Sequence, residues 1–466
     1  MDLAGLTAGE YLVLVQYELL LFAALFFLVG ALDELIVDAM WLWMKLTGRA
    51  ATGSVAFGEG CRSLNGKAAV LIPAWEEAGI LATTIEHMLA AWPQADLRVY
   101  VGCYSNDPAT LDAAFAAAPG DARLRIVIHD RHGPTTKADC LNRLYAAMEE
   151  DEQRSGRPFR MVLLHDAEDM VDPAALALCD RTIGTAGFVQ LPVLPEPQKR
   201  SRWIGSHYCE EFAEAHGKAM VVRDTFGIGL PSAGVGCALE RSVLRRLAKA
   251  RGTDGPFDPE SLTEDYELGL NVARLGERMR FLRVRYPDGR LVATRACFPA
   301  SIRAAVRQKT RWLNGIAFQG WERLGWDGSI GESWMRSRDR RGPLTALVLA
   351  TAYLLVIVAF AGWFGSTLGL VPHFELTPLL KALLVANFAS LSWRALNRFA
   401  FTAREYGMLE GLRAIARIPV TNIIAIMAGR RAFAAYLKSF RGHVAAWDKT
   451  EHDDHPARPE PLDATG

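Results

Sequence analysis

Long apolar segments near both ends of the chain constrain its fold more than any other sequence feature. Residues 11–32 contain a single charged side chain, Glu18, and residues 343–370 contain none. A helix needs about 20 apolar residues to cross the hydrocarbon layer of a membrane, so each segment is long enough to span one. Residues 379–393 form a third candidate, with Lys381 near its end, where a lysine side chain reaches the interface. The sequence therefore predicts three spans around a long middle region.

The first segment reads as a retained anchor. A cleavable signal peptide carries a basic region ahead of its apolar core, and no Lys or Arg precedes Lys45. A buried core helix is the alternative for residues 11–32. Residues 415–428 are apolar but shorter, contain Arg417 and are interrupted by Pro419. That pattern favours an interfacial or re-entrant helix over a full span.

Basic residues are distributed unevenly around the spans. Residues 1–32 contain acids but no Lys or Arg, and the loop 371–378 has none either. Four arginines stand directly before the second span: Arg336, Arg338, Arg340 and Arg341. Many more basic residues follow the third span. Because cytoplasmic segments carry the excess of Lys and Arg, the pattern predicts an N-terminus outside and a cytoplasmic middle region and tail.

The same pattern divides the chain into four parts. We expect an N-terminal transmembrane anchor (1–45), a cytoplasmic domain (46–342), transmembrane and interfacial helices (343–430) and a cytoplasmic tail (431–466). The 52 basic and 52 acidic side chains cancel, which disfavours a nucleic-acid binder. An apolar content of 50% excludes a disordered chain. The seven cysteines form no Cys-x-x-Cys pair, so we expect reduced thiols.

Short apolar runs alternate with helical stretches from Lys67 onward. The expected strands are 68–72, 97–103, 124–128, 161–165 and 188–191, and the expected helices between them are 80–92, 109–117, 137–149 and 173–183. This alternation predicts an α/β fold with a mostly parallel sheet. Ligands of such sheets bind at the carboxyl ends of the strands, so the residues there are the first site candidates. No Walker or Gly-x-Gly-x-x-Gly sequence follows a strand, which disfavours P-loop and dinucleotide enzymes.

Two charged groups follow these strands. Asp166 and Glu168 stand one residue apart after the fourth strand, where both carboxylates can reach one hard cation such as Mg²⁺ or Mn²⁺. An acidic turn before the helix near Pro173 is the alternative. Lys137 stands at a helix start, where the helix dipole disfavours a cation. A bound phosphate would relieve that cost, whereas a solvated surface lysine is the alternative.

Residues 261–265 read Ser-Leu-Thr-Glu-Asp. Ser261 and Glu264 fit a capping box, so one interpretation is simply the start of a helix. The functional interpretation makes Asp265 a general base that is held at a helix N-terminus.

Gln308, Arg311 and Trp312 are spaced to share one helix face. A guanidinium there can clamp a diphosphate, and an indole can stack on a sugar. An amphipathic interfacial helix with its tryptophan at the membrane is the alternative.

Taken in order, these motifs resemble those of membrane-embedded family 2 glycosyltransferases, the group that includes cellulose and hyaluronan synthases. Residues 166–168 look like the metal-binding DxD motif, residues 263–265 match TED, and residues 308–312 match QxxRW. The resemblance covers roughly residues 65–320. It implies a Rossmann-like, nucleotide-sugar-binding (GT-A) domain with a mostly parallel sheet, inserted between transmembrane helices.

Within that family the chain is most similar to the phage-adsorption protein B branch of inner-membrane enzymes. Residues 104–108, 298–312 and 447–452 carry this similarity. Relatives in the branch have an extra C-terminal nucleotide-sensing domain, which we do not expect here because the chain ends soon after His452. The family usually places an Asp pair directly after the second strand, but this chain has Cys103 and Tyr104 there, with Asp107 slightly later.

The resemblance implies an inverting, metal-dependent glycosyltransferase that uses a UDP-sugar, with UDP-N-acetylhexosamine suggested by the branch. Asp265 would be the base, with Glu264 and Arg311 beside it, and Asp166 and Glu168 would hold Mg²⁺ or Mn²⁺. The implied substrate-binding residues are Gln308, Trp312, Lys137, Asp107, Glu76 and Glu77.

QxxRW favours processive polysaccharide synthesis at the bacterial inner membrane, on a saccharide or lipid-linked acceptor. Because three spans make a slim channel, we expect an oligomer or an envelope partner protein, and no nucleic acid. Two alternatives stay open. One is non-processive transfer of a sugar to a lipid carrier, and the other is a membrane receptor or scaffold without catalysis.

Overall fold

A seven-stranded sheet forms the centre of the middle region, in the order β4-β3-β2-β5-β8-β6-β9. The computed structural model describes residues 7–50, 52–253, 255–441 and 456, so the motif at 447–452 lies outside the described residues. The strands are β2 (Lys67–Pro73), β3 (Leu97–Tyr104), β4 (Leu124–His129), β5 (Phe159–Leu164), β6 (Phe188–Gln190), β8 (Cys237–Glu240) and β9 (Met279–Phe281). Neighbouring strands are parallel except at β8, which runs antiparallel to both β5 and β6.

The five predicted strands are confirmed, with ends within two residues of those expected. The sequence did not reveal β8. Its four residues, Cys-Ala-Leu-Glu, are mostly good helix formers and run directly into α8 (Arg241–Arg251). Pairing with strands on both sides outweighs that local preference.

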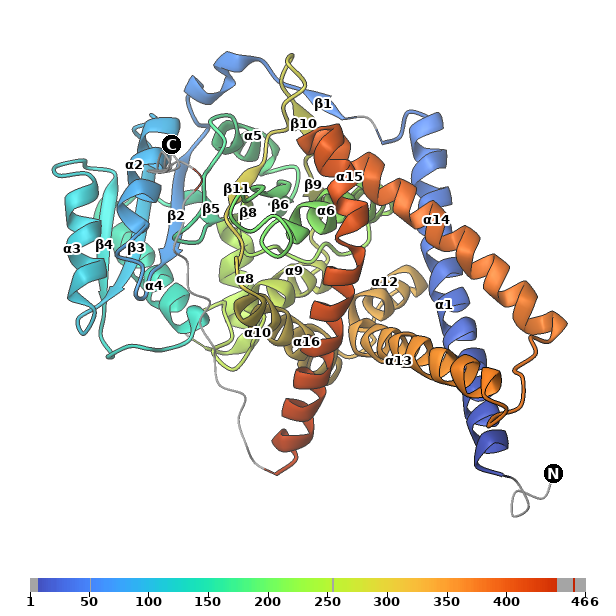
Figure 1. Cartoon of the computed structure of the whole chain (residues 1–466). Coiled ribbons are helices and arrows are strands. Elements are labelled where there is room, and N and C mark those ends of the chain that lie inside the picture. The colour runs from blue at the N-terminus through green and yellow to red at the C-terminus, as the bar shows by residue number, and fades with distance from the viewer. Residues whose placement is uncertain (1–6, 51, 254, 442–455, 457–466) are drawn as a thin grey trace, which may run out of the picture.

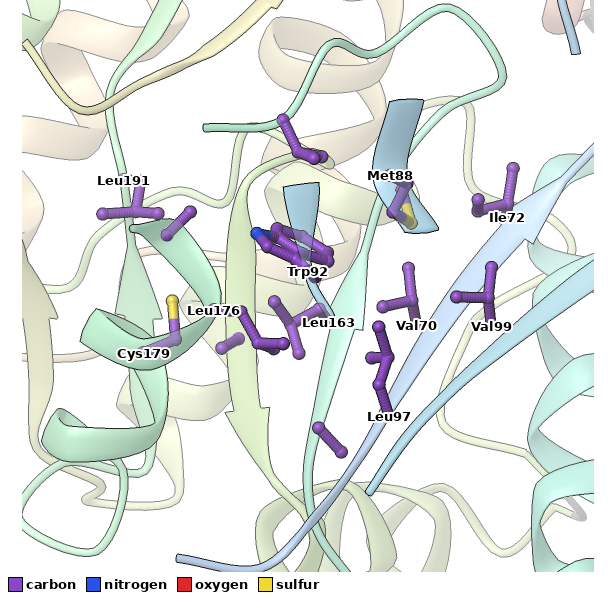
Figure 2. Close-up of a cluster of buried hydrophobic side chains, with 14 of the residues drawn as sticks. Val70, Ile72, Met88, Trp92, Leu97, Val99, Leu163, Leu176, Cys179 and Leu191 are labelled. Carbon is purple, nitrogen blue, oxygen red and sulfur yellow. The ribbon is translucent and has the colours of Figure 1, made fainter. Parts of the chain in front are cut away.

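Alternate residues of β2 enter two different cores, because successive side chains of a strand point to opposite faces. Val70 and Ile72 pack under α2 (Leu81–Ala91), α3 (Pro108–Ala117) and α5 (Ala175–Thr182). Figure 2 shows part of this core, where Trp92 and Met88 lie over Leu163 and Val70. Ala69 and Leu71 face the other core, under α4 (Lys137–Ser155), α8 and α9 (Glu264–Arg274). Helices on both faces explain why the strands are almost wholly apolar.

Smaller strands and helices lie outside the main sheet. Two short parallel pairs lie outside the main sheet, β1 (Gly53–Ser54) with β10 (Val284–Arg285) and β7 (Val193–Pro195) with β11 (Thr294–Ala296). The helices are α6 (His207–Glu214), α7 (Met220–Phe226), α10 (Ile302–Leu313), α11 (Gly320–Leu324) and α12 (Ile330–Arg340). A 3-10 turn covers Phe57–Cys61, and π-helical turns cover Ala215–Ala219 and Asn314–Gln319.

Three helices are long and apolar enough to cross a membrane: α1 (Ala8–Leu46), α13 (Gly342–Thr367) and α14 (Pro378–Tyr406). They coincide with the three predicted spans and lie together on one side of the molecule, away from β2, β3 and β4 (Figure 1). At 1.5 Å per residue, the 39 residues of α1 reach about 58 Å, well beyond a hydrocarbon layer of about 30 Å. α1 is therefore longer than such a layer is thick, and its second half packs on the α/β domain.

The expected interfacial segment at residues 415–428 falls across a bend. The helices α15 (Met408–Ala416) and α16 (Ile418–Ser439) meet there at 51°, and Pro419 stands in the first turn of α16. α16 is longer than predicted, with 22 residues. The pair is a broken span or a re-entrant segment, so the described residues contain three candidate spans, or up to four.

Acidic residues in the second half of α1 fix it to the elements around the second span. Arg338 and Arg341 both pair with Asp33 and Glu34, and Trp334 donates to Asp33 at 2.7 Å. One turn later, Asp38 accepts from Lys218 at 2.6 Å and from Trp393 at 2.8 Å. Two of the four arginines before the second span, Arg338 and Arg341, therefore pair with the first two acids after the first span.

The other end of α1 lies beside the loop that joins α13 and α14. A Cβ atom at Gly9 would stand 3.0 Å from Cδ of Pro372. The N-terminal end and this loop thus lie at the same end of the helix group, as the distribution of basic residues predicts.

Candidate active site

A cleft lies at the carboxyl ends of β2, β3 and β5, facing α6, α9 and α10. Nine of the eleven predicted site residues line it, all except Glu76 and Asp107. Its walls consist of residues 73–75, Glu77, Tyr104, 135–137, Cys140, 166–169, Val193, Phe212, Ala233, Val235, 262–265, 296–298, Gln308, Arg311 and Trp312. Segments that are up to 239 positions apart in the chain, from Pro73 to Trp312, thus meet around one space.

The acidic turn after β5, residues 166–169, is shaped by Asp169, whose role was not predicted from the sequence. Asp169 is buried, contacts Nδ1 of His165 at 2.9 Å and accepts from the backbone N–H of Asp166 at 3.0 Å. Burial raises the pKa of Asp169, while the neighbouring His165 lowers it. Asp169 therefore holds the turn, and the carboxylates of Asp166 and Glu168 are left to line the cleft. The spacing of His165 and Asp169 was the available signal.

Lys137 is a member of the site and not a solvated surface lysine. It begins α4, with Thr136 as N-cap, and its Nζ atom lies 2.6 Å from Oδ1 of Asp166 and 3.9 Å from Oε1 of Glu264. Burial would lower the pKa of Lys137, but Asp166, Glu264 and Asp265 outweigh it and raise the pKa. One ammonium group thus balances carboxylates from two motifs.

The helix that carries Asp265 starts later than a capping box would require. α9 begins at Glu264 with Thr263 as N-cap, and Ser261 instead donates to Glu267 at 2.8 Å, so the predicted box is wrong. Asp265 accepts from the N–H of Tyr266 at 2.7 Å. Burial and the adjacent Asp265 raise the pKa of Glu264. The first turn of α9 therefore presents two neighbouring carboxyl groups to the cleft.

The loop before β8 makes room for Asp265. A Cβ atom at Gly234 would lie 2.5 Å from Oδ2 of Asp265, and φ at this glycine is +77°. Only glycine satisfies both conditions. The buried Gln190 shapes the same loop, because it donates to the carbonyl of Val235 at 2.9 Å and accepts from Ala233 at 3.0 Å.

One face of α10 closes the cleft opposite the sheet. Gln308, Arg311 and Trp312 all line the space, which confirms their predicted common face. Oε1 of Gln308 is buried and has no hydrogen-bond partner within the described residues. A buried acceptor of this kind is costly unless a ligand or water supplies a donor. Gln308 is therefore suited to bind a substrate hydroxyl or amide.

An aromatic wall, made of Tyr208, Phe212, Phe298 and Trp312, flanks this face. Phe298 lies 4.6 Å from the ring of Tyr208 and 5.1 Å from that of Phe212, and Trp312 lies 6.1 Å from Tyr208. Three of these rings line the cleft, while Tyr208 packs fully buried behind them. Sugar rings stack on such surfaces, so the wall suits a saccharide. Only Trp312 was predicted from the sequence.

Asp107 and Glu76 do not line the cleft. Asp107 is the N-cap of α3 and accepts from the N–H of Glu76 at 2.6 Å. The N–H of Glu77 donates to Thr110 on the same helix at 2.9 Å. Asp107 thus fixes the backbone of the turn after β2, where Glu76 has a φ of +55°, and it acts as a positioning residue.

The acidic turn fits a divalent cation that is shared with a substrate. Within the described residues, no group of three or more His, Cys, Asp or Glu side chains could hold a metal ion. Mg²⁺ and Mn²⁺ are commonly held by one or two carboxylates while substrate phosphates and water supply the other ligands. Asp166 and Glu168 offer that donor set at the cleft.

The family model described as "Glycosyltransferase like family 2" matches residues 66–315, which is more than half of the chain. The chain belongs to glycosyltransferase family 2. It is 30% identical over 460 residues to "Bacteriophage adsorption protein B" of Escherichia coli K12 and to "Bacteriophage N4 adsorption protein B" of Escherichia coli O157:H7. Each match covers 92% of this chain and 61% of the relative, so the chain spans about three fifths of their length.

Solved structures of glycosyltransferases are also similar to this family 2 enzyme. A mannosyltransferase from Pyrobaculum calidifontis, in complex with GDP-Man and Mn²⁺, has a TM-score of 0.49 at 18% identity and covers 89% of this chain and 98% of its own. Glucosyl-3-phosphoglycerate synthase from Mycobacterium tuberculosis has a TM-score of 0.34 at 18% identity, over 57% and 82%. The family match, together with the architecture described above, establishes a glycosyltransferase with a GT-A-like α/β domain flanked by apolar helices.

Proposed function

We propose that this glycosyltransferase transfers a sugar from a UDP-sugar to an acceptor hydroxyl, with inversion at the anomeric carbon, during polysaccharide synthesis at the bacterial inner membrane. The convergence of Lys137, Asp166, Asp265 and Arg311 on one cleft carries the proposal. A diphosphate needs cationic partners, and a hydroxyl nucleophile needs a base. The cleft offers both beside an aromatic surface.

The donor diphosphate binds on the side of the acidic turn. Asp166 and Glu168 would hold Mg²⁺ or Mn²⁺, which when bound neutralises diphosphate charge. Arg311 and Lys137 add two cations to the same cleft. Both cations stabilise the negative charge that develops on the departing UDP, and Asp166 holds Lys137 in place beforehand.

Asp265 acts as the base. As the acceptor oxygen bonds to the anomeric carbon, Asp265 takes the hydroxyl proton, and the bond from that carbon to the UDP oxygen breaks with its electron pair leaving on UDP. A single displacement of this kind inverts the configuration of the carbon. The acceptor sugar stacks on Trp312, within reach of the same carboxylate.

The acceptor side continues toward the membrane helices. Ile424 and Ala428 of α16 pack in one cluster with Tyr208, Ala305 and Val306. The aromatic wall is thus joined directly to a candidate membrane helix, which supports processive synthesis of a polymer that leaves along α16. With three or four candidate spans, an oligomer or an envelope partner would complete the path.

The test is a donor screen with the full chain in purified membranes. UDP-sugars, including UDP-N-acetylhexosamines, are supplied with Mg²⁺ or Mn²⁺, and UDP release and product size are measured. We expect UDP release that EDTA abolishes and a product that lengthens with time. A single sugar on a lipid would replace the processive interpretation with transfer to a lipid carrier. Release of UDP from no donor would overturn the proposal in favour of a receptor or scaffold.

The cytoplasmic orientation is tested separately. Cys61 is an exposed free thiol of the α/β domain. A membrane-impermeant thiol reagent should label Cys61 in disrupted but not in intact cells, and labelling in spheroplasts would reverse the proposed topology.

A further inference from the structure

Arg336 of α12 is a buried cation without a partner. Only 2% of its surface is exposed, and neither Nε nor Nη1 has a hydrogen-bond partner. Within the described residues it forms no ion pair either. Removing a charge from water without a counter-charge is costly, so such groups are normally paired or hold a ligand.

Three of the four other buried arginines among the described residues have carboxylate partners, whereas Arg340 bonds to backbone carbonyls. Arg223 pairs with Asp339 at 2.6 Å, Arg241 with Glu149 and Glu152 at 2.8 and 2.9 Å, and Arg417 with Glu210 and Glu410 at 2.7 and 2.5 Å. Each has at least one carboxylate within ion-pair distance. Arg336 is as deeply buried but has none.

The surroundings of Arg336 are cationic. Arg340 lies one turn along α12 and donates to the carbonyl oxygens of Gly325 at 2.8 Å and Gly320 at 2.6 Å, and Arg274 at the end of α9 donates to the carbonyl of Leu324. Burial lowers the pKa of Arg274, and the charge of Arg336 lowers it further. The three guanidinium groups therefore lie close enough to repel one another.

The nearby carboxylates are occupied or exposed. Glu332 accepts from the N–H of Gly229 at 2.6 Å, and Asp339 is bound to Arg223 and to Tyr266. Asp327 lies 3.9 Å from Arg274, but its side chain is 94% exposed, so water screens its charge. Within the described residues, no carboxylate therefore forms an ion pair with Arg336 or with Arg340.

A glycine-containing loop, residues 325–329, covers the cluster. A Cβ atom at Gly328 would lie 3.7 Å from Nη2 of Arg336, and φ is +53° at Gly325 and +130° at Gly328. Arg274 also lines a cavity of about 270 Å³ beside α9, which shares Glu264 with the active-site cleft and is lined neither by Arg336 nor by Arg340. α12 ends two residues before α13 begins, so the cluster lies close to the first residues of a candidate membrane helix.

We propose that Arg336, flanked by Arg274 and Arg340, forms a binding site for a phosphate-bearing anion beneath the loop 325–329. Guanidinium groups bind phosphate oxygens through charge-assisted hydrogen bonds, which would satisfy the free Nε and Nη1 atoms together. The phosphate comes from a lipid headgroup at the start of α13 or from a soluble phosphate ester. None of these three arginines lines the active-site cleft, and the proposal does not rest on the proposed donor.

The first experiment measures the unfolding temperature of the full chain with three probes. Inorganic phosphate and pyrophosphate are added in a neutral detergent, and phosphatidylglycerol nanodiscs are compared with phosphatidylcholine nanodiscs. A ligand at a hundredfold excess over its Kd should raise the unfolding temperature by about 3 °C. A rise with phosphatidylglycerol alone identifies a lipid headgroup, and a rise with the soluble anions identifies a phosphate ester.

Arg336→Gln should lose the rise that wild type shows. Arg245→Gln, which removes an exposed arginine from α8, should keep it. Soluble anions that bind only in the active-site cleft would raise the unfolding temperatures of both variants equally. An equal rise in Arg336→Gln and Arg245→Gln, with the soluble anions and with phosphatidylglycerol, would overturn the proposal. No rise in wild type with any probe would overturn it as well.

A second variant distinguishes a ligand site from a merely structural arginine. Without an anion, Arg336→Met should melt at a higher temperature than wild type, because it replaces an uncompensated buried charge with an apolar side chain. With the effective anion, the order should reverse. An Arg336→Met variant that melts below wild type in neutral detergent would contradict the proposal.

Discussion

The two walls of the cleft are built in different ways. The donor wall consists mainly of charged side chains that follow β2 and β5 or begin α4, with Arg311 added from α10. The hydrogen bonds of a continuous sheet fix the part that follows β2 and β5. The acceptor wall consists of rings on α6, on α10 and at Phe298, none of which belongs to the sheet. The first wall is a property of the α/β domain, whereas the second depends on how helices pack against the C-terminal half.

One buried and one partly exposed ion pair hold the acceptor wall. α6 carries Tyr208 and Phe212 toward the cleft, and on another face Glu210 binds Arg417 at the bend between α15 and α16. Glu211 pairs with Lys309 of α10 at 2.5 Å. A change in α15 or α16 should therefore displace the acceptor wall more than the donor wall. Substitutions in the two walls should accordingly have different effects.

The largest effect is expected where the walls meet, at Asp265. Asp265→Asn keeps the size of the side chain but removes the base, so turnover should fall by about 10³-fold. The Kd for UDP should stay within about twofold, because the acidic turn and Arg311 are untouched. Asp288→Asn, in an exposed turn bonded to Arg290, is the matched control. Sugar transfer at the wild-type rate by Asp265→Asn would remove this residue from the mechanism.

Arg417→Met should destabilise the scaffold of the acceptor wall. It leaves Glu210 and Glu410 buried without their cation, which costs about 3–5 kcal/mol. Arg413→Met removes a partly exposed arginine that pairs with the same Glu410, and it should cost about 0–1 kcal/mol. Denaturant unfolding of both variants measures the difference. Equal stability of the two variants would mean that the ion pairs of Arg417 with Glu210 and Glu410 do not hold α6.

The same contrast explains what could be predicted from the sequence. Asp166 and Lys137 were predicted because strand ends converge at one edge of a parallel sheet, which local patterns reveal. The aromatic wall was missed except for Trp312, because Tyr208 and Phe298 are about 90 positions apart and only packing brings them together. Asp107 was assigned to the substrate from family resemblance, but its cap on α3 directs it to the backbone of Glu76. β8 was missed because its pairing partners are distant in sequence.

Gly315→Ala tests the contact between the π-helical turn that follows α10 and the start of α9, which carries Asp265. A Cβ atom there would lie 2.8 Å or less from the side-chain atoms of Thr263, just before Glu264. We expect a loss of about 1–3 kcal/mol and a lower rate, because α9 must shift to relieve the overlap. Gly30→Ala is the control, since a Cβ there meets nothing within 4 Å. A neutral Gly315→Ala would show that the π-helical turn can move away from α9 freely.

The smallest effect is expected for Trp312→Ala, and it should be confined to binding of the acceptor. Trp312→Ala removes a ring from the wall but leaves the donor side intact, so the KM for the acceptor should rise about tenfold while the KM for the UDP-sugar stays unchanged. Trp321→Ala is the control, because that ring is 56% exposed on α11 and does not line the cleft. If Trp312→Ala instead raised the KM for the donor, the two walls would not be separate binding surfaces. An unchanged acceptor KM would assign sugar stacking to Phe212 or Phe298, the other rings of the aromatic wall that line the cleft.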